Sequence, residues 1–93
     1  MVQNGTPTGN LAARTSAYLK EQGFHVVQFG NADRFDYART VIIYYAEKPY
    51  TVARLAQVFN VPQEAIQNAT GQQSPVDIRV IIGADFKLPE GNQ

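Results

Sequence analysis

The sequence predicts an α/β domain (an α+β sandwich) with the element order βαββαβ, in which a four-stranded sheet carries two main helices on one face. Three observations lead to this prediction. Residues 2–14 read as a short strand, a glycine turn and a helix. A second strand follows that helix at once, and a later proline opens a second amphipathic helix that leads to a last strand. With right-handed crossovers, this order most simply gives one sheet with both helices on one side.

The first helix is expected over residues 10–22. Small and apolar side chains recur there at helical spacing and define one buried stripe: Leu11, Ala12, Thr15, Tyr18 and Leu19. Thr8 or Asn10 is expected to cap its start, because a side-chain oxygen there can accept a hydrogen bond from a free amide. Gly23 suits the left-handed conformation that often follows a helix.

The next two strands are expected at residues 24–29 and 40–45, with a polar loop over residues 30–39 between them. The stretch 40–45 is apolar on both faces and rich in β-branched and aromatic residues. Such a pattern is typical of a strand that is covered on both sides. We therefore expect it to lie centrally in the sheet.

The second helix is expected to begin at Pro49 and to end at Asn60. Its apolar residues fall at the spacing i, i+3, i+4 and i+7: Val52, Leu55, Ala56 and Phe59. Pro62 opens a further short helix through Ala65 and Ile66, as a proline in a first turn does. Residues 70–75 form a polar loop, and residues 76–82 form the last strand.

The split arrangement of such a sheet alternates strand directions and places the first and third strands in the middle. Three polar loops then share one edge of the sheet, at residues 4–9, 31–39 and 70–75. An all-parallel sheet is the alternative, because the loop after Gly30 is long enough to permit it.

Composition narrows the classes of function. The 93 residues correspond to one domain, expected over residues 1–88, with a frayed tail at residues 89–93. Eight basic residues balance eight acidic ones, which argues against nucleic acid as a partner. The chain has no cysteine, which excludes disulfides, thiolate metal sites and cysteine nucleophiles. The first strand is very short, so we expect the chain to be a fragment of a longer protein.

Three patterns bear on the chemistry of a possible site. The loop at residues 4–9 precedes a helix and has two glycines, but it matches neither common phosphate-binding motif, so turn geometry explains it better. Asn31, Asp33 and Asp36 offer oxygen ligands for Ca²⁺, yet the spacing of a calcium loop is absent and turn formation is simpler. His25 is the only histidine and has no partners for a catalytic triad. No catalytic or metal site is therefore predicted.

Aromatic residues are numerous for so small a domain. Rings can stack against sugar faces, although strand aromatics more often serve packing. Among them we expect Phe35 and Tyr37, in the polar loop, to be exposed.

Four motifs together resemble the LytR C-terminal domain. They are N-G-T-x-x-G-x-L-A-A-R at residues 4–14, G-F-x-V-V at 23–27, G-N-A-D-x-x-D-Y-x-x-T-x-I at 30–42 and V-I-I-G-A-D-F at 80–86. The resemblance covers nearly the whole chain in the correct order. This module often follows the catalytic domain of LytR-CpsA-Psr proteins of bacterial envelopes, and it also occurs without that domain.

The resemblance implies an extracytoplasmic accessory domain whose parent protein is anchored by an N-terminal membrane helix. The catalytic LytR-CpsA-Psr domain transfers glycopolymers to peptidoglycan, but its pyrophosphate-binding and magnesium-binding residues have no counterparts here. We therefore expect no enzymatic activity and no cofactor. The expected partner is peptidoglycan, an attached glycopolymer or another envelope protein.

The expected binding surface is the loop edge, with the candidate residues Asn4, Thr6, Asn31, Asp33, Asp36, Tyr37 and Thr40. Some of these residues are also suited to holding the loops together. Two alternatives stay open. One is self-association into a homo-oligomer through a sheet edge or the exposed face of the sheet. The other is a glycan-binding module of LysM type, because residues 49–68 and 80–89 are similar to the helical core and last strand of that module.

Overall fold

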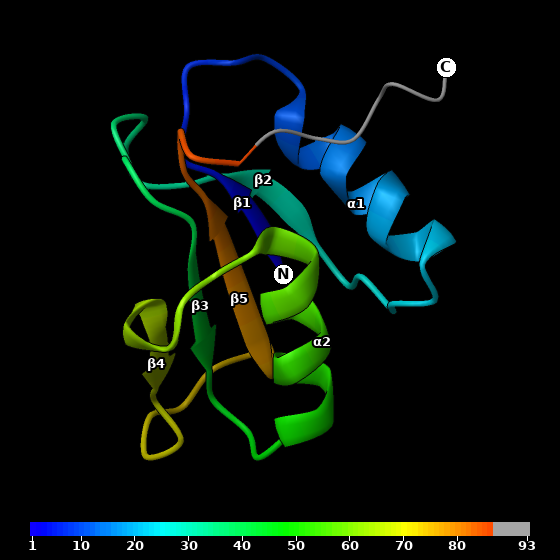
Figure 1. The fold of residues 1–93 in the computed structure, drawn as a ribbon, viewed down its shortest axis with the longest axis vertical. Coiled ribbons are helices and arrows are strands. Elements are labelled where there is room, and N and C mark those ends of the chain that lie inside the picture. The colour runs from blue at the N-terminus through cyan, green and yellow to red at the C-terminus, as the bar shows by residue number, and fades with distance from the viewer. Residues whose placement is uncertain (87–93) are drawn as a thin grey trace.

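A five-stranded sheet with two helices packed on one of its faces makes up the fold of residues 1–86, the part of the chain that the computed structural model describes (Figure 1). The elements follow in the order β1 (Val2–Asn4), α1 (Leu11–Glu21), β2 (Phe29–Asn31), β3 (Val41–Tyr44), α2 (Pro49–Phe59), the 3-10 turn η1 (Gln63–Ala65), β4 (Ile66–Asn68) and β5 (Ile78–Ile82). The predicted α/β class is confirmed, and β4 adds one short strand to the predicted four. The expected tail at residues 89–93 lies outside the described residues.

The order of the strands is β2-β1-β5-β3-β4. β1 is parallel to both of its neighbours, β5 is antiparallel to β3, and β3 is parallel to β4. The prediction that the first and third strands lie side by side was therefore wrong, because β5 separates them. The all-parallel alternative is also wrong. The burial of β5 explains its place inside the sheet. Val80, Ile81 and Ile82 are consecutive and all buried, so side chains on both faces of β5 are shielded from water, as is typical of a strand with a neighbour on each side.

β2 begins later than predicted. The N–H of Val2 donates to the carbonyl of Gln28 at 3.0 Å, and β1 pairs with β2 only from Val2 onward. Residues 24–27 lie before this point, and no strand among residues 1–86 pairs with them, so they do not form part of the sheet. β4 was missed because it has three residues and follows η1 directly; the predicted short helix ends at Ala65 and Ile66 already belongs to the strand.

Both predicted helices are confirmed. Gly23 follows α1 with φ of 93°, and Asn60 ends α2 with φ of 54°, so both helices end in a left-handed residue. The predicted cap of α1 was wrong. Asn10 precedes α1 with φ of 62° and makes no side-chain capping hydrogen bond, because its left-handed backbone differs from the extended one that such a cap requires.

The core lies between the helices and one face of the sheet. Val2 pairs with Val80, and Val80 pairs with Ile42, so all three side chains point to the same face. They form one buried cluster with Leu19 of α1 and Leu55 of α2, among others. Within residues 1–86, no helix is long and apolar enough to span a bilayer.

Candidate functional site

The loop edge is the end of the sheet at which β1, β2 and β5 stop, and three loops come together there at the top of Figure 1. Backbone hydrogen bonds join these loops to one another and to the ends of the strands. Gly5 donates to the carbonyl of Ile82 at 2.9 Å and Ala32 to that of Asn4 at 2.9 Å. Tyr37 donates to the carbonyl of Gly5 at 3.1 Å and accepts from the N–H of Ala84 at 2.9 Å. The loops at residues 5–10, 32–39 and 83–86 therefore form one connected layer.

The loop at residues 70–75 does not belong to this edge, contrary to the prediction. Because β5 is parallel to β1, the loop that leads into β5 lies at the opposite end of the sheet from the loop that leaves β1. The loop edge instead gains residues 83–86, which follow β5.

Asn4 is the last residue of β1 and Thr6 lies in the first loop, and both are almost fully buried. The carboxamide oxygen of Asn4 accepts hydrogen bonds from the N–H of Thr6 at 2.9 Å and from its hydroxyl at 2.7 Å. The carboxamide nitrogen of Asn4 donates to the carbonyl of Thr8 at 2.6 Å, and the Thr6 hydroxyl accepts from the N–H of Thr8 at 3.2 Å. Both side chains therefore hold the turn that precedes α1.

Thr40 joins the loop after β5 to the start of β3. Its N–H and its hydroxyl both donate to one carboxylate oxygen of Asp85, each at 2.9 Å, and the same hydroxyl accepts from the N–H of Gly83 at 3.0 Å. Thr40 is 1% exposed. Asp85 was not among the predicted residues, although it lies in the V-I-I-G-A-D-F motif at residues 80–86.

The second loop carries a polar cluster at the surface, which consists of Asp33, Arg34, Asp36 and Tyr37. The Tyr37 hydroxyl donates to a carboxylate oxygen of Asp33 at 2.8 Å, which lowers the pKa of Asp33 and raises that of Tyr37. Arg34 pairs with Asp36 at 2.8 Å, and its guanidinium carbon lies 4.2 Å from the centre of the Tyr37 ring. The structure thus brings three of the predicted residues together: Asp33 and Tyr37 bond to each other, and Asp36 pairs with Arg34.

A shallow hollow of about 500 Å³ lies beside this cluster, over the start of α1. Phe29 of β2 and Phe35 of the second loop line it and are 52% and 49% exposed. Exposed polar residues line it too, among them Thr8, Asn10 and Asn31. The predicted exposure of Phe35 is confirmed, but that of Tyr37 is not, because Tyr37 is partly buried. Phe29 was not among the predicted site residues, although it lies at the end of a strand next to the polar loop.

The arrangement is suited to noncovalent recognition. Within residues 1–86, no group of three or more His, Cys, Asp and Glu side chains is placed to hold a metal ion. The loop edge offers rings for stacking and amide and hydroxyl groups for hydrogen bonds. His25 lies outside it, in a groove at the other end of the sheet.

Comparisons with known proteins agree with this architecture. The soluble domain of a conserved hypothetical secreted protein from Mycobacterium marinum has a similar fold, with a TM-score of 0.66 and 20% sequence identity. The match covers 92% of this chain and 58% of the other, so this chain spans less than two thirds of that domain. A search of the curated proteins finds no match. The model of one family, described as LytR cell envelope-related transcriptional attenuator, matches residues 1–86. The chain therefore belongs to the LytR C-terminal domain family, as its motifs indicated.

Proposed function

We propose that this chain is a noncatalytic accessory domain of a cell-envelope protein, works outside the cytoplasm and binds a wall glycan at the hollow between Phe29 and Phe35. The observation that carries the proposal is the pair of half-exposed rings that line one hollow together with exposed polar side chains. Membership in a cell-envelope family supports the location. The similar fold in a secreted protein of Mycobacterium marinum is consistent with it.

The ligand class follows from the chemistry of the hollow. A sugar ring presents an apolar face of C–H groups and a rim of hydroxyls, so it needs an aromatic surface and hydrogen-bonding partners together. Phe29 and Phe35 supply the surface, and Asn31 supplies an exposed carboxamide. The polar cluster around Asp33 and Tyr37 borders this region on the same loop as Phe35.

The seven binding residues that the sequence predicted divide into two groups. Asn4, Thr6 and Thr40 use their polar groups inside the loops and act as supports. Asn31, Asp33 and Asp36 are exposed, and Tyr37 is partly buried with its hydroxyl on the exposed carboxylate of Asp33. We assign direct contact to this outer group together with the two rings.

The test is retention of the purified domain on insoluble peptidoglycan sacculi, with and without their attached polymers. We expect retention, and we expect Phe35→Ala to weaken it about tenfold, which corresponds to about 1.4 kcal/mol. Tyr50→Ala is the matched control, because Tyr50 is 74% exposed and lies on α2, away from the hollow. Equal retention of Phe35→Ala and the unchanged domain would contradict the assigned surface, and no retention on either preparation would contradict the glycan.

Self-association is a second candidate function, because β2 is an edge strand with an exposed Phe29. An edge strand presents unpaired backbone groups that a second copy can pair with. Light scattering at high concentration tests it directly. A monomer over the whole concentration range would argue against self-association and would leave the glycan proposal unaffected.

A further inference from the structure

The free edge of β2 borders the hollow between Phe29 and Phe35. β2 is the outermost strand on its side of the sheet, and among residues 1–86 it pairs with β1 alone. All three residues of β2 line the hollow, and two of them, Phe29 and Asn31, are exposed. A ligand that occupies the hollow therefore lies beside an open edge of the sheet.

Alternate residues of β2 turn their backbone groups away from β1. The carbonyl of Gln28 and the N–H of Ala32 both bond to residues of β1, at 3.0 Å and 2.9 Å. The backbone groups of successive residues in a strand point to opposite sides, so those of Phe29 and Asn31 point outward. Neither residue has a backbone partner on that side within residues 1–86. Two N–H groups and two carbonyls are therefore free beside the hollow.

The spacing of these free groups fits an extended peptide. Phe29 and Asn31 are two residues apart, which corresponds to about 6.6 Å along a parallel strand. A second extended chain presents its own outward groups at the same interval, so it can bond to both residues at once. Peptides that add to an exposed sheet edge in this way are held by their main chain.

A carboxylate without a cationic partner lies just beyond this edge. Asp33 follows β2 by two residues and is exposed. The hydroxyl of Tyr37 donates to it at 2.8 Å, and this bond lowers the pKa of Asp33, so the carboxylate is ionised at neutral pH. Arg34 pairs with Asp36, and no ion pair engages Asp33 within residues 1–86. Asp33 is therefore available to an amine.

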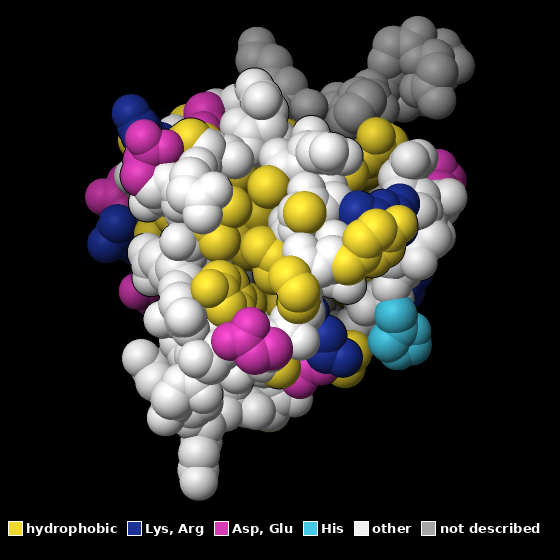
Figure 2. Space-filling view, turned by 60° about the horizontal axis from the view of Figure 1, so that its bottom comes forward, with side chains coloured by type: hydrophobic (Ala, Val, Ile, Leu, Met, Phe, Trp, Pro, Cys, Tyr) yellow, Lys and Arg dark blue, Asp and Glu magenta, His cyan; other side chains and the backbone are white. Residues whose placement is uncertain are grey.

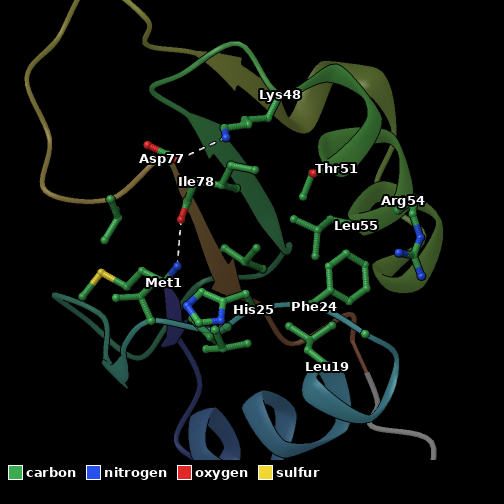
Figure 3. Close-up of a pocket in the computed structure, with 16 residues that line it drawn as sticks. Met1, Leu19, Phe24, His25, Lys48, Thr51, Arg54, Leu55, Asp77 and Ile78 are labelled. Carbon is green, nitrogen blue, oxygen red and sulfur yellow. Dashed lines mark hydrogen bonds and ion pairs between the residues drawn. The ribbon is translucent and has the colours of Figure 1, made fainter.

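The opposite end of the sheet has a different character. Figure 2 looks toward that end, and hydrophobic side chains gather at the centre of the face. The carboxylate there, Asp77, is exposed like Asp33 but already has a cation, because the Lys48 ammonium lies 3.7 Å from it (Figure 3). Asp77 is thus a matched reference for the unpaired carboxylate of Asp33.

We propose that the ligand of the hollow is a sugar that carries a peptide with a free amine, a chemical class that occurs in peptidoglycan. This inference rests on the glycan proposed above and adds a second part to it. The sugar stacks on the rings of Phe29 and Phe35. The peptide lies extended along β2 and bonds to the outward backbone groups of Phe29 and Asn31, and its amine pairs with the carboxylate of Asp33.

The test compares three soluble peptidoglycan fragments: a disaccharide with an amine-bearing peptide, the same fragment with its amine acetylated, and the disaccharide alone. NMR titration of the purified domain gives the three dissociation constants. We expect acetylation to weaken binding about threefold, as for an exposed ion pair. We expect removal of the peptide to weaken it by about tenfold or more, because the main-chain hydrogen bonds are then lost.

Hydrogen exchange locates the peptide on the protein. The amides of Phe29 and Asn31 should exchange about tenfold more slowly or less when the amine-bearing fragment is bound. The amide of Ala32 is the internal reference, since it already donates to the carbonyl of Asn4.

A pair of variants tests the carboxylate. Asp33→Asn keeps an acceptor for the Tyr37 hydroxyl and removes the charge. It should weaken binding of the amine-bearing fragment about threefold and leave that of the acetylated fragment unchanged. Asp77→Asn removes an exposed charge at the other end of the sheet and should leave all three dissociation constants unchanged.

Equal affinity for the disaccharide with and without its peptide would overturn this inference and would leave the glycan proposal standing. Exchange at Phe29 and Asn31 that slows with protein concentration alone would also overturn it, because a second copy would then occupy the edge. An equal loss for both peptide fragments in Asp33→Asn would contradict the pairing of Asp33 with the amine. Absence of binding of all three fragments would contradict the glycan proposal itself.

Discussion

The carboxylate of Asp85 accepts two hydrogen bonds from Thr40, one from its N–H and one from its hydroxyl, each at 2.9 Å. Because β5 and β3 are antiparallel neighbours, this contact closes the sheet at the end where β3 begins. The Thr40 hydroxyl also accepts from the N–H of Gly83. One buried side chain thus bonds to two residues of the loop after β5, Gly83 and Asp85, which lie 43 and 45 residues away.

Thr40→Val should lower the free energy of unfolding by about 1–3 kcal/mol, because it leaves the N–H of Gly83 buried without its partner. Thr40→Ser is the matched control, since it keeps the hydroxyl and should lose less. Urea unfolding of the three proteins measures the differences. A Thr40→Val protein as stable as Thr40→Ser would show that these hydrogen bonds contribute little.

Asn4→Ala should also destabilise the domain, by about 1–3 kcal/mol, because the N–H and hydroxyl of Thr6 lose their common acceptor in a buried turn. Asn4→Asp keeps that acceptor, but it buries a carboxylate and turns one of its oxygens toward the carbonyl oxygen of Thr8. Thermal unfolding should therefore show a loss of stability in both variants relative to the unchanged domain. An Asn4→Ala protein as stable as the unchanged domain would contradict the role of these bonds.

Gly5→Ala should cost about 1–3 kcal/mol through overpacking. A Cβ at this position would lie 2.5 Å from a ring carbon of Tyr37 and 2.7 Å from the carbonyl oxygen of Ile82, which is backbone. Gly9→Ala is the control: nothing lies within 4 Å of its added Cβ, and its φ is not positive. Denaturant unfolding should show a gain of about 0.4–1 kcal/mol for Gly9→Ala. Equal effects at both glycines would contradict the close approach at Gly5.

Thr15→Val should leave the free energy of unfolding unchanged or raise it. The hydroxyl of Thr15 is fully buried in α1 and has no hydrogen-bond partner within residues 1–86. Replacing it with a methyl group therefore breaks no hydrogen bond, and the folded protein no longer has to bury an unpaired hydroxyl. Thr6→Val makes the same chemical change where the hydroxyl is bonded, and it should destabilise. A loss at Thr15 as large as that at Thr6 would show that the Thr15 hydroxyl does have a partner in solution.

Tyr37→Phe should raise the pKa of Asp33 toward its ordinary value of 3.8, since the hydrogen bond from the Tyr37 hydroxyl is the main cause that lowers it. Carboxyl NMR titration measures this shift, and Tyr50→Phe, on α2, is the control. The sign for stability follows from the lowered pKa. The contribution of this bond is fully present above pH 3.8 and is lost as the pH falls through the lower pKa of the folded state. An unchanged titration of Asp33 in Tyr37→Phe would contradict the bond.

Local patterns were sufficient to predict the helices and the family. The apolar spacing of α2 and the glycine after α1 are properties of short stretches, and a helix makes its hydrogen bonds within such a stretch. The loop motif N-G-T likewise pointed to the loop edge. The motif did not tell whether the side chains of Asn4 and Thr6 contact a ligand or stabilise a turn. That depends on whether these side chains are buried in the folded chain, as they are.

The sequence by itself determined the α/β class, the two helices and the presence of a loop edge rich in Asn, Asp and Thr. Only the tertiary structure decided the place of β5 between β1 and β3, the bond between Thr40 and Asp85, and the hollow beside Phe29. The physical reason is that strands and loop contacts are completed by residues far apart in the chain. A strand's neighbours are chosen by burial on both of its faces, which no single stretch of sequence records.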